Sequence, residues 1–206
     1  MSNYKENLAF IKKSFKDNHP TIICASKYIS SVEMRKLYEE GINHFAENRT
    51  KSLLTKKNEL KDLNVTWHFI GHLQSNKIKG FINEIDYLHS LSTLKQATLI
   101  NKHRIEPLKC FIQVNILNES QKSGIAENLL EEFLLSLKKY DKIEVIGLMT
   151  MGMIDNPIET ERAFRRLNEL KNKYQLEDLS MGMTDDYELA LKHGTTFLRL
   201  GRILVK

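Results

Sequence analysis

The chain contains 206 residues, 41% of them hydrophobic and 28% charged, and carries a formal net charge of +5 at pH 7. This length and apolar content predict one soluble domain that spans residues 1–206 and has its own core. Lysines are mixed with acidic residues in segments such as "KKNELKD" and "NELKNKY", a pattern typical of solvated helix faces. The positive charge therefore does not indicate a nucleic-acid-binding surface.

Residues 1–19 open the chain with a charged, amphipathic pattern that predicts a helix and lacks the apolar stretch of a signal peptide. No apolar run approaches the length of a membrane span, so no membrane partner is expected. The two cysteines, Cys24 and Cys110, lie in separate apolar runs and are predicted to be unpaired core residues. Together these features predict a cytoplasmic protein in a reducing compartment.

Short strand-like runs recur along the whole chain and alternate with segments of helical periodicity. Residues 31–41 and 125–140 are two such helical segments, with apolar residues spaced three and four apart. The alternation predicts parallel βαβ units, and eight units predict an α/β fold of the TIM-type (β/α)8 barrel. An open, doubly wound sheet is the alternative. The predicted strands are 21–27, 42–48, 65–71, 85–91, 109–116, 143–150, 178–183 and 195–201.

Polar residues and glycines stand at the carboxyl ends of these strands, where barrels of this type carry their functional sites. They supply amine, amide, hydroxyl and guanidinium groups, which the barrel would bring together around one mouth. The residues at these ends are Lys27, Glu47, Asn48, Gly71, His72, Asn115, Thr150, Met151, Gly182–Thr184 and Arg199–Gly201.

The alternation of side chains along a strand predicts where the two cations of the mouth point. If Lys27 faces the barrel interior, so does Ile23, while Cys24 faces the helices. Arg199 shares its inward face with Phe197, and closure of the barrel would place the last strand beside the first. Two cations in one pocket repel each other unless an anion joins them.

The segment "SMGMTDD" follows a strand with a glycine turn and supplies a candidate phosphate site. Thr184, with Asp185 and Asp186 after it, is predicted to be the N-cap and first turn of a helix. Backbone N–H groups there, and those that follow Arg199, could bind a phosphate group.

A buried lysine has a lowered pKa, so its neutral amine can attack a carbonyl and form a Schiff base. A lysine, a phosphate cradle and a partner for an aromatic ring together suggest pyridoxal 5′-phosphate (PLP). The alternative is that Lys27 extends from the barrel rim into solvent and the glycines only turn the chain.

Seven segments in the same order carry a resemblance to a known family. They are "ASK", "HFAENR", "WHFIGHLQSNK", "QVNILNESQKSG", "GLMTM", "LSMGMTDD" and "LRLGR". In this respect the chain resembles the PLP homeostasis proteins, which are similar to the N-terminal barrel domain of alanine racemase standing alone. The resemblance covers the chain from about residue 20 to its end.

The resemblance implies that Lys27 carries PLP as a Schiff base and that Arg199 approaches the pyridine nitrogen. An arginine is always cationic, so it disfavours a protonated ring and weakens carbanion stabilisation. Met151 stands where the racemase barrel would place a histidine, so only apolar packing is implied there. The other implied cofactor-binding residues are Asn48 near the cofactor, Thr184 with the backbone of Gly201 and Arg202 at the phosphate, and Ser180 and Met183 nearby.

Three departures from the family pattern concern the loops around the mouth. Tyr28 and its neighbours lack the proline that often follows the lysine, and Gly152 and Met153 replace a common Ala-Pro. Thr184 stands where serine is usual, which keeps the hydroxyl group. The departures put the loop shapes in question and remove no implied cofactor contact.

Two histidines and one loop have less specific roles. His68 is predicted to face inward, where it would approach the cofactor or serve as a buried structural histidine. His68 and His72 are four apart, but the first lies in a strand and the second beyond its end, so no metal pair is expected. The loop 118–124, with Glu119, is predicted to be a polar segment near the mouth, and the simpler interpretation is a solvated loop.

The expected function is that of a PLP carrier in intracellular vitamin B6 homeostasis, not of an enzyme. A two-base racemase needs groups on both faces of its substrate, one of them commonly supplied by another domain, and the chain ends five residues after Gly201. We therefore expect a monomer that delivers PLP to apoenzymes. The alternatives are a PLP-dependent enzyme such as an amino-acid racemase, a barrel enzyme acting on a phosphorylated metabolite without PLP and, last, a nucleic-acid-binding protein.

Overall fold

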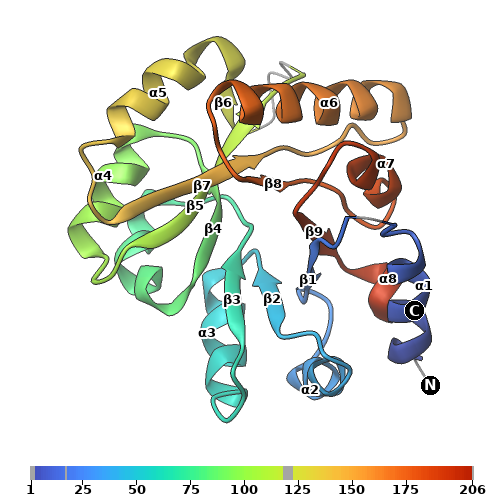
Figure 1. The fold of residues 1–206 in the computed structure, drawn as a ribbon. Coiled ribbons are helices and arrows are strands. Elements are labelled where there is room, and N and C mark those ends of the chain that lie inside the picture. The colour runs from blue at the N-terminus through green and yellow to red at the C-terminus, as the bar shows by residue number, and fades with distance from the viewer. Residues whose placement is uncertain (1–2, 17, 118–122, 206) are drawn as a thin grey trace.

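The computed structural model describes residues 3–16, 18–117 and 123–205, and these form a parallel barrel surrounded by helices (Figure 1). Strand β9 pairs with β1 and β4 pairs with β5, so the sheet closes on itself. The predicted (β/α)8 barrel is confirmed, and closure excludes the open sheet. Its eight strands are β1 (Thr21–Ala25), β2 (His44–Glu47), β3 (Thr66–Phe69), β4 (Tyr87–Leu91), β5 (Leu108–Asn115), β7 (Ile143–Met149), β8 (Asp178–Ser180) and β9 (Phe197–Leu200).

The helices lie on the outside of the barrel (Figure 1). Between β3 and β4 the connection consists of two short 3-10 helices, η1 (Ser75–Gly80) and η2 (Ile82–Glu84). The α-helices are α1 (Tyr4–Lys13), α2 (Ser31–Glu39), α3 (Thr50–Glu59), α4 (Leu94–His103), α5 (Leu130–Leu137), α6 (Pro157–Lys173), α7 (Tyr187–Lys192) and α8 (Arg202–Val205).

The starts of the longer helices follow from capping residues. Ser30 and Glu33 form a capping box at the start of α2, in which each side chain bonds the backbone N–H of the other. Asn156 caps α6 through a bond from the Glu159 N–H, and Pro157 occupies the first turn, where its missing N–H costs nothing. The predicted helix over 31–41 is confirmed, and it ends two residues earlier.

The predicted helix over 125–140 is wrong in its first third. Ile125–Ala126 form the short strand β6, which pairs in parallel with Val114 and Asn115 at the end of β5. A 3-10 turn, η3 (Glu127–Leu129), then leads into α5. The apolar spacing that suggested one helix is real only from Leu130 onward, because Ile125 is buried by strand pairing instead.

The interior of the barrel holds a small apolar cluster separate from the larger one between sheet and helices. Phe111, Met149 and Phe197 meet Ile23 inside the barrel. Cys24 belongs to the outer cluster, which confirms the alternation predicted for the first strand. Both cysteines are buried and unpaired, as predicted, and burial raises the pKa of Cys24 to about 12.

The N-terminal helix is shorter than predicted and packs beside the last one (Figure 1). Asn3 caps α1, and Leu8 and Ile11 are its buried residues. The side-chain amide of Asn7 donates to the carbonyl of Leu204 in α8 at 3.2 Å. Within the described ranges, none of the helices has the length and apolar character needed to cross a membrane.

Candidate functional site

Lys27 lies at the mouth of the barrel, in the turn that follows β1, and its side chain is exposed to solvent. The ammonium group sits 4.9 Å from the centre of the Tyr28 ring, and Tyr28 is itself 79% exposed. The expectation of a buried amine is therefore wrong, because the strand ends at Ala25 and the chain turns outward before Lys27. Burial cannot be the reason for reactivity at this lysine.

The turn that carries Lys27 is anchored from behind by a buried ion pair. Lys56 of α3 donates to the backbone carbonyl of Ser26 at 2.7 Å and to Oε1 of Glu47 at 2.6 Å. The Ser26 hydroxyl donates to the same carboxylate oxygen at 2.8 Å, and the Ser26 N–H donates to the carbonyl of Ala46 at 2.9 Å. These bonds fix the residue immediately before Lys27 to β2 and α3.

Sequence reasoning placed Glu47 in the polar mouth and missed Lys56. In the structure Glu47 faces the helix layer and has no exposed surface. A signal for Lys56 was available, because it lies three residues after Leu53 and four before Leu60, both buried, and so shares the inward face of the helix. A lysine on a buried helix face needs a partner, and Glu47 supplies it.

Arg199 points into the barrel, as its alternation with Phe197 predicted, and is only 5% exposed. Its guanidinium donates to Oγ of Ser180 at 2.6 Å and to the carbonyl of Thr150 at 3.0 Å. Burial lowers the pKa of Arg199 to about 10, which leaves it cationic at neutral pH. Among the residues that the structure describes, no carboxylate lies within ion-pair distance of it.

The predicted N-cap at Thr184 is wrong. Helix α7 begins at Tyr187 and its N-cap is Asp186, whose carboxylate accepts a hydrogen bond from the N–H of Met183 at 2.5 Å. Thr184 lies in the turn between Met183 and helix α7 and is half-buried. This turn is tied to the start of α8, directly after β9, by an ion pair between Asp185 and Arg202 at 2.7 Å. The two predicted phosphate-binding segments therefore lie together on one side of the mouth.

Two glycines shape the mouth in different ways. A Cβ at Gly71 would come within 2.1 Å of the carbonyl oxygen of Asn48, so only glycine allows this close approach. A Cβ at Gly201 would meet its nearest protein atom, in Ala25, at 3.5 Å, an ordinary contact. The chain thus leaves room beside Gly201, next to the strand that leads to Lys27.

Asn48, Met151 and Met183 complete the rim of the mouth. Asn48 is exposed directly after β2, and both methionines are 38% exposed. The predicted loop over 118–124 lies mostly outside the described residues. Its described end, Ser123, accepts a hydrogen bond from the side-chain amide of Gln113 at 2.8 Å through its carbonyl oxygen.

His68 is fully buried inside the barrel, below the mouth. Its Nε2 lies 2.9 Å from Nδ1 of His44, and its Nδ1 lies 2.9 Å from Nε2 of His89. His89 continues the contacts with Oγ of Ser180 at 2.8 Å. Both ring nitrogens of His68 are therefore engaged within the protein. Sequence analysis did not single out His44 or His89, although both stand on strands with the same inward alternation as His68.

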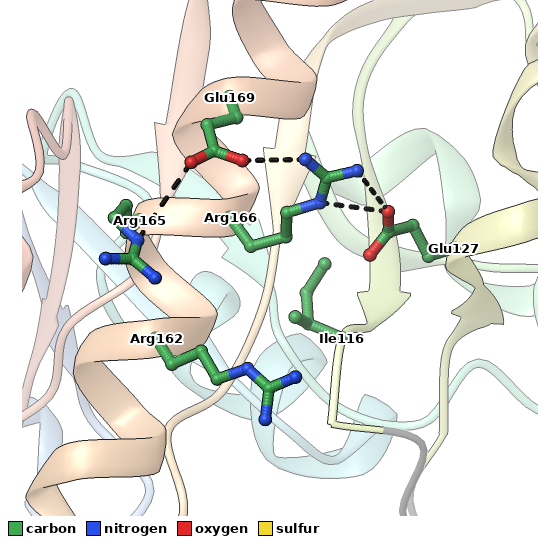
Figure 2. Close-up of a pocket in the computed structure, with 6 residues that line it drawn as sticks. All are labelled: Ile116, Glu127, Arg162, Arg165, Arg166 and Glu169. Carbon is green, nitrogen blue, oxygen red and sulfur yellow. Dashed lines mark hydrogen bonds and ion pairs between the residues drawn. The ribbon is translucent and has the colours of Figure 1, made fainter.

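The cleft in Figure 2 lies between α6 and two residues that follow the strands β5 and β6, Ile116 and Glu127. Arg166 pairs there with Glu127 and Glu169, both at 2.6 Å, and Arg165 lies 4.0 Å from Glu169. Its charges are thus largely compensated within the chain, so it is a weak candidate for a site. Within the described residues, no His, Cys, Asp and Glu side chains are grouped in a way that could hold a metal ion.

Comparisons with known proteins identify the family and the fold of the chain. Residues 1–206 match the family model "Alanine racemase, N-terminal domain". The pyridoxal phosphate homeostasis protein of Aquifex aeolicus is 36% identical over 199 residues, which cover 91% of this chain and 87% of that protein. The protein of the same name from Escherichia coli (strain K12) is 32% identical over 195 residues, covering 88% and 82%.

Solved structures show the same fold. PipY of Synechococcus elongatus PCC7942 has been solved with PLP bound, and that structure superposes with a TM-score of 0.86 at 28% identity, covering 99% of this chain and 100% of that one. Alanine racemase from Corynebacterium glutamicum superposes with a TM-score of 0.77 at 18% identity, covering 98% of this chain and 60% of that one. The racemase likeness concerns the barrel alone.

Proposed function

Because the chain belongs to the pyridoxal phosphate homeostasis protein family, within the wider alanine racemase N-terminal domain family, we propose that it binds PLP at the barrel mouth and serves vitamin B6 homeostasis. The observation that carries the proposal is the buried cation Arg199, whose hydrogen-bond partners among the described residues are all neutral, beneath a mouth that also carries Lys27. Such a site favours an anionic or electron-rich ligand.

The residues of the mouth fit the functional groups of PLP. When bound, PLP supplies an aldehyde that a lysine amine can capture as a Schiff base and a pyridine ring that can withdraw electrons. Lys27 is the attachment point in this proposal, and Arg199 faces the pyridine nitrogen. Thr184 and the backbone of Gly201 and Arg202 hold the phosphate, where the chain leaves room beside Gly201.

The remaining proposed residues surround the ring or act from below. Asn48, Met151 and Met183 contact the cofactor from the rim, where each is at least partly exposed. Ser180 and His68 lie deeper. Ser180 acts on the cofactor through its hydrogen bond with Arg199. His68 acts indirectly, because its ring nitrogens already bond two other histidines.

We further propose that the protein holds PLP without turning over amino acids, as a cytoplasmic monomer that delivers it to apoenzymes. An arginine at the pyridine nitrogen disfavours ring protonation, and so disfavours the carbanion chemistry of a racemase. The exposure of Lys27 leaves the attachment atom open to water, which suits exchange better than a protected reaction.

The test is the visible absorption spectrum of the purified protein after incubation with PLP. Wild type and Lys36→Ala, which removes an exposed lysine of α2, are expected to show a yellow band that borohydride abolishes, and Lys27→Ala is expected to lack it. No band in wild type, even with excess PLP, would overturn the proposal. Amino-acid turnover that disappears in Lys27→Ala would show a racemase-like enzyme instead of a carrier.

A further inference from the structure

Three histidines form a continuous hydrogen-bonded row inside the barrel, which we call the histidine string. His44, His68 and His89 come from the neighbouring strands β2, β3 and β4 (Figure 1), and each contact between them is 2.9 Å. The string ends at Ser180, whose Oγ lies 2.8 Å from Nδ1 of His89 and accepts from Arg199 at 2.6 Å. It thus connects the far end of the barrel to the buried cation under the mouth.

The direction of the hydrogen bonds in this row follows from the cation together with the need of each buried donor for an acceptor. A guanidinium can only donate, so the Ser180 oxygen accepts from Arg199. Within the described residues, the acceptor left for the Ser180 hydroxyl proton is Nδ1 of His89. The Nε2–H of His89 then donates to Nδ1 of His68. By the same rule the Nε2–H of His68 donates to Nδ1 of His44.

Packing holds the rings of the string in place and keeps them neutral. The ring of His68 stacks on Tyr87 with centres 4.5 Å apart, and the ring of His89 stacks on Phe111 at the same distance. Burial lowers the pKa of both histidines, and the charge of Arg199 lowers that of His89 further. A neutral His89 is required here, because a doubly protonated imidazole has no nitrogen left to accept the Ser180 proton.

We propose that His89 is a positioning residue for Arg199, with His68 and His44 holding His89 in the accepting tautomer. By taking the Ser180 proton, His89 keeps the oxygen lone pairs turned toward the guanidinium. Without that acceptor the hydroxyl is free to rotate, and one of the two neutral groups that hold the buried cation is lost. The proposal rests on the proposed function only where it assigns Arg199 to the pyridine nitrogen of PLP.

Two variants of His89 separate positioning from simple packing. His89→Leu removes the acceptor, whereas His89→Asn keeps an oxygen that can accept from Ser180 and is expected to rescue the wild-type behaviour. Phe111→Leu is the matched control, since it removes the ring stacked on His89 and leaves the string intact. Thermal unfolding of all three checks that each variant folds.

The first readout needs no PLP. In nitrogen NMR of isotope-labelled protein, His89 of wild type is expected to be protonated on Nε2 and bare on Nδ1. The guanidinium signals of Arg199 are expected to shift in His89→Leu and to stay in place in His89→Asn and Phe111→Leu. A wild-type His89 protonated on Nδ1 would overturn the proposal even if His89→Leu fails to fold. Unchanged Arg199 signals in folded His89→Leu would overturn it equally.

The second readout is PLP affinity, followed through the visible band. The dissociation constant is expected to rise about tenfold in His89→Leu, the effect of losing one hydrogen bond to a charged group, and to change little in the other two variants. A wild type that binds no PLP would refute the proposed function and leave the NMR result standing. A wild type that binds PLP no more tightly than His89→Leu would refute the role of the string in cofactor binding.

Discussion

Two lysines near the mouth have opposite surroundings, and sequence analysis singled out only Lys27. Lys27 follows an apolar strand directly, which made it conspicuous, yet it is exposed. Lys56 sits in a lysine-rich helix, where it looked like one solvated charge among several, yet its side chain is only 12% exposed and it pairs with the fully buried Glu47. The sequence pattern predicts which strand ends lie together. The direction of the Lys27 side chain depends on where β1 ends, and it ends at Ala25, two residues earlier.

The buried pair between Lys56 and Glu47 should contribute much more to stability than any surface pair. Lys56→Met leaves a buried carboxylate without its cation, and one oxygen of Glu47 already has no partner in the described structure. We expect the free energy of unfolding, measured in urea, to fall by about 3–5 kcal/mol. Arg35→Ala, which removes the exposed pair with Asp62, is the control and should change it little. A Lys56→Met protein as stable as wild type would contradict the role given to this pair.

The histidine string predicts that the fold loses stability in mild acid. Burial holds the pKa of His68 and His89 below the usual 6.5, so below that pH the unfolded chain binds more protons than the folded one. The free energy of unfolding should therefore fall as the pH drops below about 6.5, by at most roughly 1.4 kcal/mol per pH unit for each histidine. Burial raises the pKa of Asp186, which acts with the opposite sign.

Urea unfolding at a series of pH values measures this slope, and two variants isolate its source. His89→Asn should flatten the curve, because one of the neutral buried imidazoles is gone. His19→Asn, at an exposed position, should leave it as in wild type. Equal slopes in wild type and His89→Asn would show that the string does not resist protonation.

At the scale of elements, strand pairing explains what apolar spacing alone could not. All eight barrel strands were predicted, because each is a short apolar run between turn residues. The start of the segment 125–140 was mistaken for helix because a strand of two residues is too short to show an alternation of apolar and polar side chains. The histidine string was missed for a similar reason, since it depends on the register of three strands.

The turn between β8 and α7 depends on a glycine with a left-handed backbone. Gly182 has φ +91, and a Cβ there would lie 2.6 Å from that of Ala190. Gly182→Ala should lower the free energy of unfolding by about 1–3 kcal/mol and weaken PLP binding, because Met183 and Thr184 follow it. Gly80→Ala is the control, since a Cβ there meets nothing within 4 Å. Thermal unfolding and the visible band measure the two effects, and a fully stable Gly182→Ala would contradict the strain argument.

At the scale of the whole molecule, closure makes the barrel one cooperative unit. The interior cluster joins side chains from β1, β2, β5, β7 and β9, and no part of the sheet keeps its inner face covered without the rest. We expect a single unfolding transition in urea. The fluorescence change of the only tryptophan, Trp67 in β3, should occur at the same urea concentration as the loss of the helical circular dichroism signal. Transitions at different urea concentrations would indicate that part of the barrel opens separately.

The contact between α1 and α8 has a consequence for the connectivity of the chain. Asn7 bonds Leu204, so segments almost two hundred positions apart in sequence are neighbours in space (Figure 1). A short linker could therefore join the two ends, and new ends could be opened in the exposed turn at Gly80. Such a circular permutant should form the same barrel with the same mouth, although the strands would follow one another in a different order along the chain.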